Sequence, residues 1–541
     1  MKRIATIFDI GTKRFIFFHT VCDFHHSTGM SEPSATFKSA LWNHAGRVVE
    51  YFLIYVTSVL IARSLGVERN GTFASLISIS QLLMVIASFG LETSLNKHIP
   101  QLPEENRAAR LRYLVRRVFL VRFGLVVFCS LGMFGIAWNL WSPATNFAVG
   151  YLWLLVGYAA VRSLASIATM VLIAQLKTGL SAKVNLAARL LECGGVVVFG
   201  SIGIDAAGIL LLFSFTGLFQ VLALIIFSRD DFVGRAIKTA VAPVFMFGGI
   251  YWANTIVEYF LGRQGDVLFL SLLLHETSQA SLYDVAFSVN QLAALGMTAG
   301  LGGVTFAMFS RLAVSSSEGI ERFHAFLVRV TSLLSIPMYG FILFNADPVV
   351  RVLYSPRYAE AAILIQGIAA FRIASRVFGG SENSELMLSK GMVGTMVLVG
   401  LIGAVVNIAL NILLIPAFGA SGAVAASGAA NLLISLLGAI VVMRTVDVHI
   451  QWQFWLKLVM AGACASWLCS IPVLEPTILS LVGRIGLYAV LMVIMLLIAK
   501  PLTHIDSILF AKLHNRLEHV IRFFVHGTQP ESVGQPRDPR Q

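Results

Sequence analysis

Hydrophobic residues of this chain lie in long, almost unbroken runs that are separated by short polar or glycine-containing segments. A membrane-spanning helix needs about 20 mostly apolar residues, whereas a strand of an outer-membrane barrel needs about ten residues of alternating polarity. The runs have the length of helices, so the pattern predicts an all-α, polytopic membrane protein. About 14 transmembrane helices are predicted, at approximately 42–64, 72–97, 118–138, 147–174, 183–203, 206–227, 243–262, 281–310, 325–344, 359–387, 392–414, 421–443, 454–474 and 477–499.

Two of these spans are less regular than the others. The fifth carries Lys183, Arg189 and Glu192 within its apolar run, and the seventh continues into apolar residues over 265–274. We expect Arg189 to pair with Glu192, which lies three residues further along the same helix.

The composition agrees with a protein that lies mostly in a bilayer. Of 541 residues, 57% are hydrophobic and only 13% are charged, whereas a soluble chain carries about 25% charged residues. This balance excludes a soluble enzyme, a disordered chain and a nucleic-acid-binding domain.

The net charge of +12 is distributed unevenly between the predicted loops. The tails and the even-numbered loops hold 24 Lys and Arg residues, whereas the odd-numbered loops hold four. Positive residues accumulate on the cytoplasmic side of membrane proteins. Both termini are therefore predicted to be cytoplasmic, with tails at 1–41 and 501–541. The spacing of apolar residues over 505–524 predicts an amphipathic helix on the membrane surface.

The N-terminal tail contains His19, Cys22, His25 and His26, a spacing that resembles a metal cluster. We interpret it as a loose polar tail and predict no metal site. We expect residues 1–29 to be either a disordered extension or a segment upstream of a translation start at Met30.

An internal repeat relates the two halves of the chain. Residues 49–53 and 257–261 are both Val-Glu-Tyr-Phe-Leu, and further matches follow at an offset of 210, among them Ser78 with Ser288 and Gln81 with Gln291. Six spans separate equivalent helices, so the halves have the same orientation in the membrane. We therefore expect six-helix bundles at 42–241 and 242–444, followed by two further spans over 445–500, with a site between the bundles.

Polar residues recur on one face of the first, second, seventh and eighth spans. Charges inside a membrane are costly and usually face protein or water. These stripes predict a hydrophilic cavity between the bundles, although polar ties between helices would give the same pattern. The candidate substrate-binding residues in the stripes are Arg47, Glu50, Gln81, Glu258, Asp266, Asp284 and Gln291.

Further arginines lie within the spans. Arg122, Arg162 and Arg329 would face the cavity or extend to the membrane interface. Arg372 and Arg376 share one helix face, and like charges there repel unless an anion or an acid lies between them. Glu382 or Glu385 would supply that acid.

Arginine and carboxylate in one cavity suit an amphiphilic anion, because guanidinium binds phosphate through paired donors. The chain has no GxxxxGK[ST] motif and no soluble module for nucleotide hydrolysis. We expect no cofactor. We expect transport to be driven by an ion gradient (protons or sodium), by the membrane potential or by the substrate gradient.

Three stretches resemble the polysaccharide transporter family, the bacterial lipid-linked oligosaccharide flippases, which belong to a superfamily with lipid II flippases and multidrug extruders. Residues 62–73, ARSLGVERNGTF, resemble the family's turn after the first helix. Residues 407–427, NIALNILLIPAFGASGAVAAS, resemble its signature between the eleventh and twelfth helices. Looser matches are Ile99-Pro100, the entry to the tenth helix at 358–361, and Lys390.

The resemblance implies transport of a short glycan on a polyprenyl pyrophosphate to the outer leaflet of a bacterial inner membrane, for lipopolysaccharide or exopolysaccharide biosynthesis. The resemblance places the cavity residues mainly on the first, second, seventh and eighth helices but assigns no exact position. Among the striped residues there, we expect Arg47 to bind the pyrophosphate, and Glu50 and Glu258 to bind sugar or couple ions. Gln81, Gln291, Asp266 and Asp284 would then contact sugars.

Two alternatives stay open. A cation–drug antiporter of the same superfamily would need an acidic cavity with few basic residues. A membrane polysaccharide polymerase or glycosyltransferase would need a sizeable outer loop with catalytic acids, whereas the longest predicted outer loops are about 263–280 and 345–358.

Overall fold

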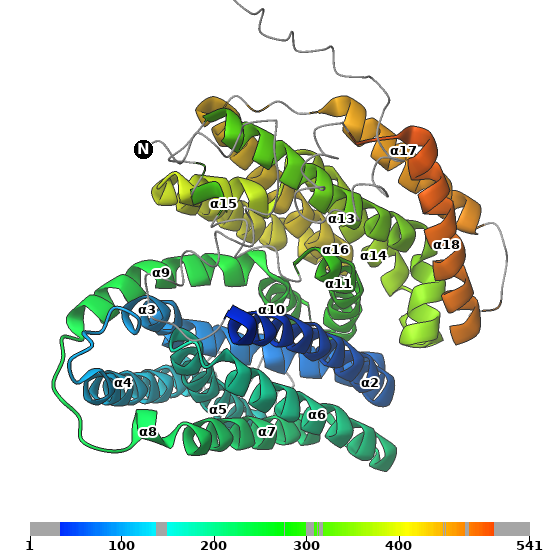
Figure 1. Ribbon diagram of the computed structural model, residues 1–541. Helices are drawn as coiled ribbons and strands as arrows, with labels where there is room; N and C mark the ends of the chain where they lie inside the picture. The colour runs from blue at the N-terminus through cyan, green and yellow to red at the C-terminus, as the bar shows by residue number, and fades with distance from the viewer. Residues whose placement is uncertain are drawn as a thin grey trace, which may run out of the picture.

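The computed structural model is all-helical (Figure 1). It describes residues 33–136, 149–274, 276–298, 308–310, 312, 317–446, 448, 451–470, 475 and 477–502. The amphipathic helix predicted at 505–524 and the His19–His26 cluster lie outside these residues.

The first half of the described chain forms seven helices. Its elements are α2 (Pro33–Ser88), α3 (Leu91–His98), α4 (Arg107–Ile136), α5 (Val149–Ala174), α6 (Thr178–Ile202), α7 (Ala206–Phe227) and the short α8 (Arg229–Phe232).

The second half begins after an extended segment. Its elements are α9 (Ala242–Leu261), α10 (Arg263–Leu273), α11 (Thr277–Thr298), α13 (Ser317–Leu353), the 3₁₀ helix η3 (Pro356–Tyr358), α14 (Ala361–Val377), α15 (Ser381–Ser389), α16 (Val393–Thr445), α17 (Trp452–Ser470) and α18 (Ile478–Ala499).

Nine helices in the described part of the chain are long and apolar enough to cross a membrane. Two of them, α2 and α16, each turn at a glycine with positive φ, Gly66 (75°) and Gly419 (58°). A left-handed backbone favours glycine because other residues carry a Cβ that clashes there. Helix α16 covers the predicted eleventh and twelfth spans, whereas α2 covers the first span and the second only as far as Ser88, and α9, α11 and α17 lie at three more. The chain is thus an all-α polytopic membrane protein, and the number 14 stays a prediction.

Three predicted spans are interrupted. The second is divided at 89–90, between α2 and α3. The seventh is divided by Gly262, where the backbone is extended between α9 and α10. The tenth is divided at 378–380, between α14 and α15. Interrupted helices free backbone groups in the apolar region, and such breaks are tolerated where they are buried in protein or line a water-filled cavity.

The early and late helices form two groups (Figure 1). In the first, α2 packs against α4, α5, α6 and α7. In the second, α13 packs against α14, α14 against α16, and α17 against both α13 and α18. Helices α9, α10 and α11 lie between the groups and contact both, since α11 packs on α2 as well as on α14.

Candidate functional site

Asp266 lies in the first turn of α10 and is completely buried. It accepts hydrogen bonds from the Tyr283 hydroxyl on α11 (2.5 Å) and from the side-chain amides of Asn411 (2.8 Å) and Asn407 (3.2 Å) on α16. The carboxylate therefore ties three helices together directly after the break at Gly262. We call Asp266, Tyr283, Asn407 and Asn411 the Asp266 cluster.

The two asparagines of this cluster also present oxygen atoms. The Oδ1 atoms of Asn407 and Asn411 are buried and have no hydrogen-bond partner among the described residues. A buried carboxylate with nearby unpaired amide oxygens is an all-oxygen donor set, the type that hard cations prefer. Every hydrogen-bond donor to Asp266 is a neutral side chain, so a bound proton or cation would balance the negative charge of the carboxylate.

Asp284 on α11 lies beside an arginine. Arg263 at the start of α10 places Nε 3.4 Å from Asp284 Oδ1, and its Nη1 donates to the Ser288 hydroxyl at 2.8 Å. Asp284 and Ser288 thus both contact the guanidinium of Arg263. The sequence pattern had placed Arg263 in the predicted outer loop at about 263–280.

Glu50 on α2 belongs to a charge network inside the first helix group. Its Oε1 lies 3.6 Å from Arg189 Nε on α6, and Arg189 also donates to Glu192 Oε2 at 2.7 Å. Glu192 accepts further hydrogen bonds from Arg162 on α5 and from the Thr216 hydroxyl on α7 (3.0 Å). The expected Arg189–Glu192 pair is confirmed, and it is part of a network that spans four helices.

The remaining predicted site residues are more accessible. Glu258 on α9 is exposed and accepts a hydrogen bond from Asn254 at 2.8 Å. Gln81 on α2 is half-buried and Gln291 on α11 is exposed. Arg47 lies on α2 one turn before Glu50, and its side chain is outside the described residues.

The structure therefore distributes the predicted residues over three environments. Asp266 is buried in a cluster, Glu50 and Asp284 are ion-paired with arginines, and Gln81, Glu258 and Gln291 are more accessible. No ion pair or hydrogen bond joins two of the predicted site residues in the described part of the chain.

Arg372 is a residue whose surroundings the sequence did not resolve. It lies near the middle of the predicted tenth span, with its guanidinium carbon 5.9 Å from the centre of the Phe287 ring on α11. Its neighbour Arg376 binds Glu382, with Nη2 2.5 Å from Oε1, so Glu382 is the acid that the spacing required. Arg372 itself has no carboxylate or hydrogen-bond partner among the described residues, which makes it an uncompensated cation at membrane depth.

The sequence left open whether Arg122 and Arg162 face the cavity or extend to the membrane interface. Both are buried in the first helix group. Arg122 is 1% exposed and pairs with Glu92 at 2.9 Å. Arg162 is 9% exposed and pairs with Glu192. The interface alternative is wrong for both, because each finds a carboxylate on a neighbouring helix. Arg329 is 6% exposed and donates to Gln451 at 2.5 Å.

The two halves of the chain touch at the predicted outer end. Asn70 donates to Ser281 at 2.8 Å, and the Tyr358 hydroxyl donates to the carbonyl of Ala62 at 3.0 Å. Gly71 is so close to α11 that an added Cβ would lie 1.8 Å from the carbonyl oxygen of Thr277.

The halves also touch at the predicted cytoplasmic end, through α3 and α9. The Ser94 hydroxyl donates to the carbonyl of Val244 at 2.5 Å, and Lys97 Nζ lies 3.7 Å from the centre of the Phe247 ring. A Cβ on Gly90 would lie 2.1 Å from the carbonyl oxygen of Gly248. The two halves are therefore in contact at both predicted ends.

The fold and these buried charges define a class, a polytopic membrane transporter. A model of the family described as "Polysaccharide biosynthesis protein" matches residues 16–363. The chain belongs to this family and has the fold of the multidrug, oligosaccharidyl-lipid and polysaccharide superfamily.

Individual relatives are more distant. The "Probable low-salt glycan biosynthesis flippase Agl15" of Haloferax volcanii is 24% identical over 424 residues, which is 76% of this chain and 85% of the relative.

Solved structures share the fold. The lipid II flippase MurJ in its inward closed conformation aligns with a TM-score of 0.67 at 14% identity, over 88% of this chain and 99% of that one. An inward-facing multidrug resistance MATE transporter aligns with a TM-score of 0.58 at 13% identity, over 73% and 94%. This is a family of transporters and flippases, so the polymerase and glycosyltransferase alternative is excluded.

Proposed function

We propose that this protein moves a polyprenyl-pyrophosphate-linked oligosaccharide from the cytoplasmic to the outer leaflet by alternating access. The family supports a role in polysaccharide biosynthesis, and the relative from Haloferax volcanii is described as a glycan biosynthesis flippase. We place the protein in a bacterial inner membrane with both termini in the cytoplasm, as the distribution of Lys and Arg predicts.

Arg372 is the observation that carries this proposal. A guanidinium without an acidic partner at membrane depth is costly unless a ligand supplies the negative charge. A pyrophosphate does so, and its oxygens match the paired donors of arginine. Arg47 on α2 would be the second cation, so that the pyrophosphate is bound from both helix groups.

The polar residues at the boundary would receive the glycan. Glu258 and Gln291 are accessible, Gln81 is half-buried, and carboxylates and amides accept and donate hydrogen bonds to sugar hydroxyls. Glu50 and Asp284 are paired with arginines and would contact sugars after those pairs rearrange. The Asp266 cluster is buried and its hydrogen-bond donors are neutral, so it suits the coupling ion, sodium or a proton, better than a sugar.

Transport would require the two contact zones to open alternately. The predicted outer zone closes around Gly71 and Thr277, and the predicted cytoplasmic zone closes around Gly90 and Gly248. Substrate would enter when the α3–α9 contact separates and leave when the α2–α11 contact separates.

A drug antiporter is the alternative that shares this fold. A cationic drug would be repelled by Arg372, so the proposal predicts that deletion of the gene leaves drug susceptibility unchanged. Increased susceptibility that the protein reverses would support the antiporter.

Depletion of the protein, followed by extraction of lipid-linked intermediates, tests the proposal. We expect one polyprenyl-linked oligosaccharide to accumulate on the cytoplasmic leaflet. Arg372→Ala should reproduce that accumulation, and Arg372→Lys should do so partially because it retains charge without the planar fork. Arg351→Ala is the matched control, because Arg351 is exposed and paired with Asp347 on its own helix. An Arg372→Ala variant that exports glycan normally would refute the proposal.

A further inference from the structure

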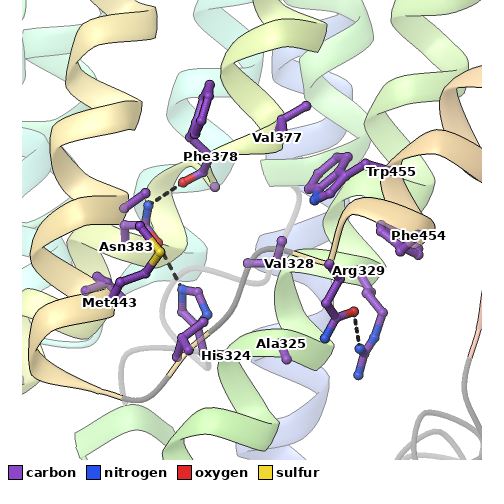
Figure 2. A pocket seen from close by; sticks show the side chains of 15 residues that line it. His324, Ala325, Val328, Arg329, Val377, Phe378, Asn383, Met443, Phe454 and Trp455 are labelled. Atoms are coloured by element: carbon purple, nitrogen blue, oxygen red, sulfur yellow. Dashed lines mark hydrogen bonds between the residues drawn. The ribbon is translucent and has the colours of Figure 1, made fainter.

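A second group of polar residues surrounds the break in the tenth span, away from Arg372. Here the structure contains a cavity of about 50 Å³, bounded by α13, the α14–α15 break, the end of α16 and the start of α17 (Figure 2). A cavity that accepts a water molecule needs at least about 10–15 Å³, so this one has room for a few. It lies where spans nine and thirteen begin and spans ten and twelve end, which is the predicted cytoplasmic side.

His324 lines this cavity and is 5% exposed. Its Nε2 lies 2.9 Å from Asn383 Oδ1 (Figure 2). The orientation of the Asn383 amide is fixed, because its Nδ2 donates to the carbonyl of Phe378 at 2.8 Å. Oδ1 can then only accept, so Nε2 of His324 must carry the hydrogen.

This tautomer leaves Nδ1 of His324 with its lone pair. Nδ1 is buried and has no hydrogen-bond partner among the described residues. A buried acceptor without a donor costs roughly 1–3 kcal/mol, and His324 is one of the residues that line the cavity. Water that entered the cavity would supply such a donor and a path for a proton.

The charged groups near His324 are an ion pair and one further arginine. Arg376 on α14 and Glu382 on α15 form an ion pair beside Asn383, and the Thr331 hydroxyl donates to Glu382 at 2.6 Å. This pair is neutral as a whole. Arg329, on the same helix as His324, lies at the far side of the cavity and donates to Gln451 (Figure 2). The walls from α16 and α17 add no titratable side chain, since they consist of Ala439, Val442, Met443, Phe454 and Trp455.

We propose that Nδ1 of His324 is a proton-binding site that opens to the cytoplasmic side through this cavity. A proton from cavity water binds Nδ1 while Nε2–H stays bonded to Asn383, so imidazole becomes imidazolium without a change of ring position. The new positive charge lies next to Glu382 and competes with Arg376 for it. Proton occupancy would therefore weaken the ion pair that joins the two parts of the interrupted tenth span.

The first-half counterpart of this span has no such break. Helix α5 runs without interruption from Val149 to Ala174, and its Arg162 pairs with Glu192 on α6. The proton site is thus a property of the second half alone, and it does not depend on which substrate the protein carries.

Nuclear magnetic resonance of the full chain in lipid nanodiscs, with ¹⁵N-labelled histidine and no substrate, tests this proposal. Between pH 5 and 9 we expect one imidazole that keeps Nε2–H throughout and gains a proton at Nδ1, and this titration should be absent from His324→Gln. His98→Gln is the matched control, because His98 lies on α3 and bonds only to Ser94, and it should leave the titration unchanged.

A second variant guards against misfolding of His324→Gln. Asn383→Leu removes the acceptor that fixes the tautomer, so we expect the same imidazole to populate both neutral tautomers at high pH. An imidazole that stays neutral down to pH 5, a wild-type Nδ1–H tautomer, or a titration that persists in His324→Gln would each overturn the proposal. The readout involves no transport, so it is independent of the flippase assignment.

Discussion

Glu192 offers a quantitative test of the buried charge network. It is 2% exposed and accepts hydrogen bonds from Arg162, Arg189 and Thr216. Glu192→Gln preserves the shape of the side chain but removes the negative charge from between two guanidinium groups. Removing one partner of a buried ion pair costs about 3–5 kcal/mol, because the other charge is left without compensation.

The surroundings place the expected loss at the lower end of that range. Arg189 keeps Glu50 at 3.6 Å, and Arg162 keeps the Gln220 side-chain oxygen at 3.1 Å. We therefore expect Glu192→Gln to lower the free energy of unfolding by about 3 kcal/mol, which is roughly a hundredfold change in the unfolding equilibrium. Titration of the purified protein from mild detergent into sodium dodecyl sulfate measures this difference.

Two further variants complete the test. Glu104→Gln removes a carboxylate that is 86% exposed and paired with Arg107, so it should cost under about 1 kcal/mol. In the double variant Glu192→Gln with Arg162→Gln, most of the lost stability should return, because the unpaired charge is also gone. The reasoning would be refuted if Glu192→Gln were no more destabilising than Glu104→Gln, or if the double variant were the least stable of all.

Three other variants probe transport. Arg47→Ala should abolish glycan flipping and leave membrane insertion intact, as measured by export and by the amount of protein in the membrane; full export would remove Arg47 from the site. Asp266→Asn should make flipping insensitive to imposed sodium and proton gradients in vesicles, whereas a retained response would place the coupling ion elsewhere. Gly71→Ala should hold the outer contact open and increase labelling of nearby engineered cysteines from outside, since its Cβ meets a backbone carbonyl. Gly157→Ala, with no atom within 4 Å of its Cβ, is the control for that experiment.

Much of the membrane architecture could be predicted from the sequence because bilayer thickness fixes helix length. The predicted span at 206–227 coincides with α7, and that at 477–499 differs from α18 by one residue at its start. The motif at 62–73 contains Gly66, where α2 turns. The predicted eleventh span ends at 414, whereas the turn within α16 occurs at Gly419, where positive φ is accommodated.

The site was predicted less completely, for a physical reason. Helical spacing shows which side chains share a face of one helix, but it does not show which helices lie side by side. Arg189 and Glu192 were paired correctly because they are three residues apart, whereas Asp266 and Asn411 are 145 residues apart. Asn407 and Asn411 had been read as part of a turn signature, and their contact with Asp266 carries no sequence signal of its own.

The internal repeat allows the surroundings of Arg162 in the first half to be compared with those of Arg372 in the second half. At the offset of 210 that relates Ser78 to Ser288, Arg162 corresponds to Arg372, so both halves retain an arginine at this point of the span. Arg162 pairs with Glu192, whereas no carboxylate pairs with Arg372 among the described residues. In the first half the arginine is therefore neutralised from within and serves packing. In the second half its charge is left for something that the chain does not provide. Under the proposed function this difference makes Arg372 an anion-binding position, which a pyrophosphate that crosses the membrane would neutralise during each cycle.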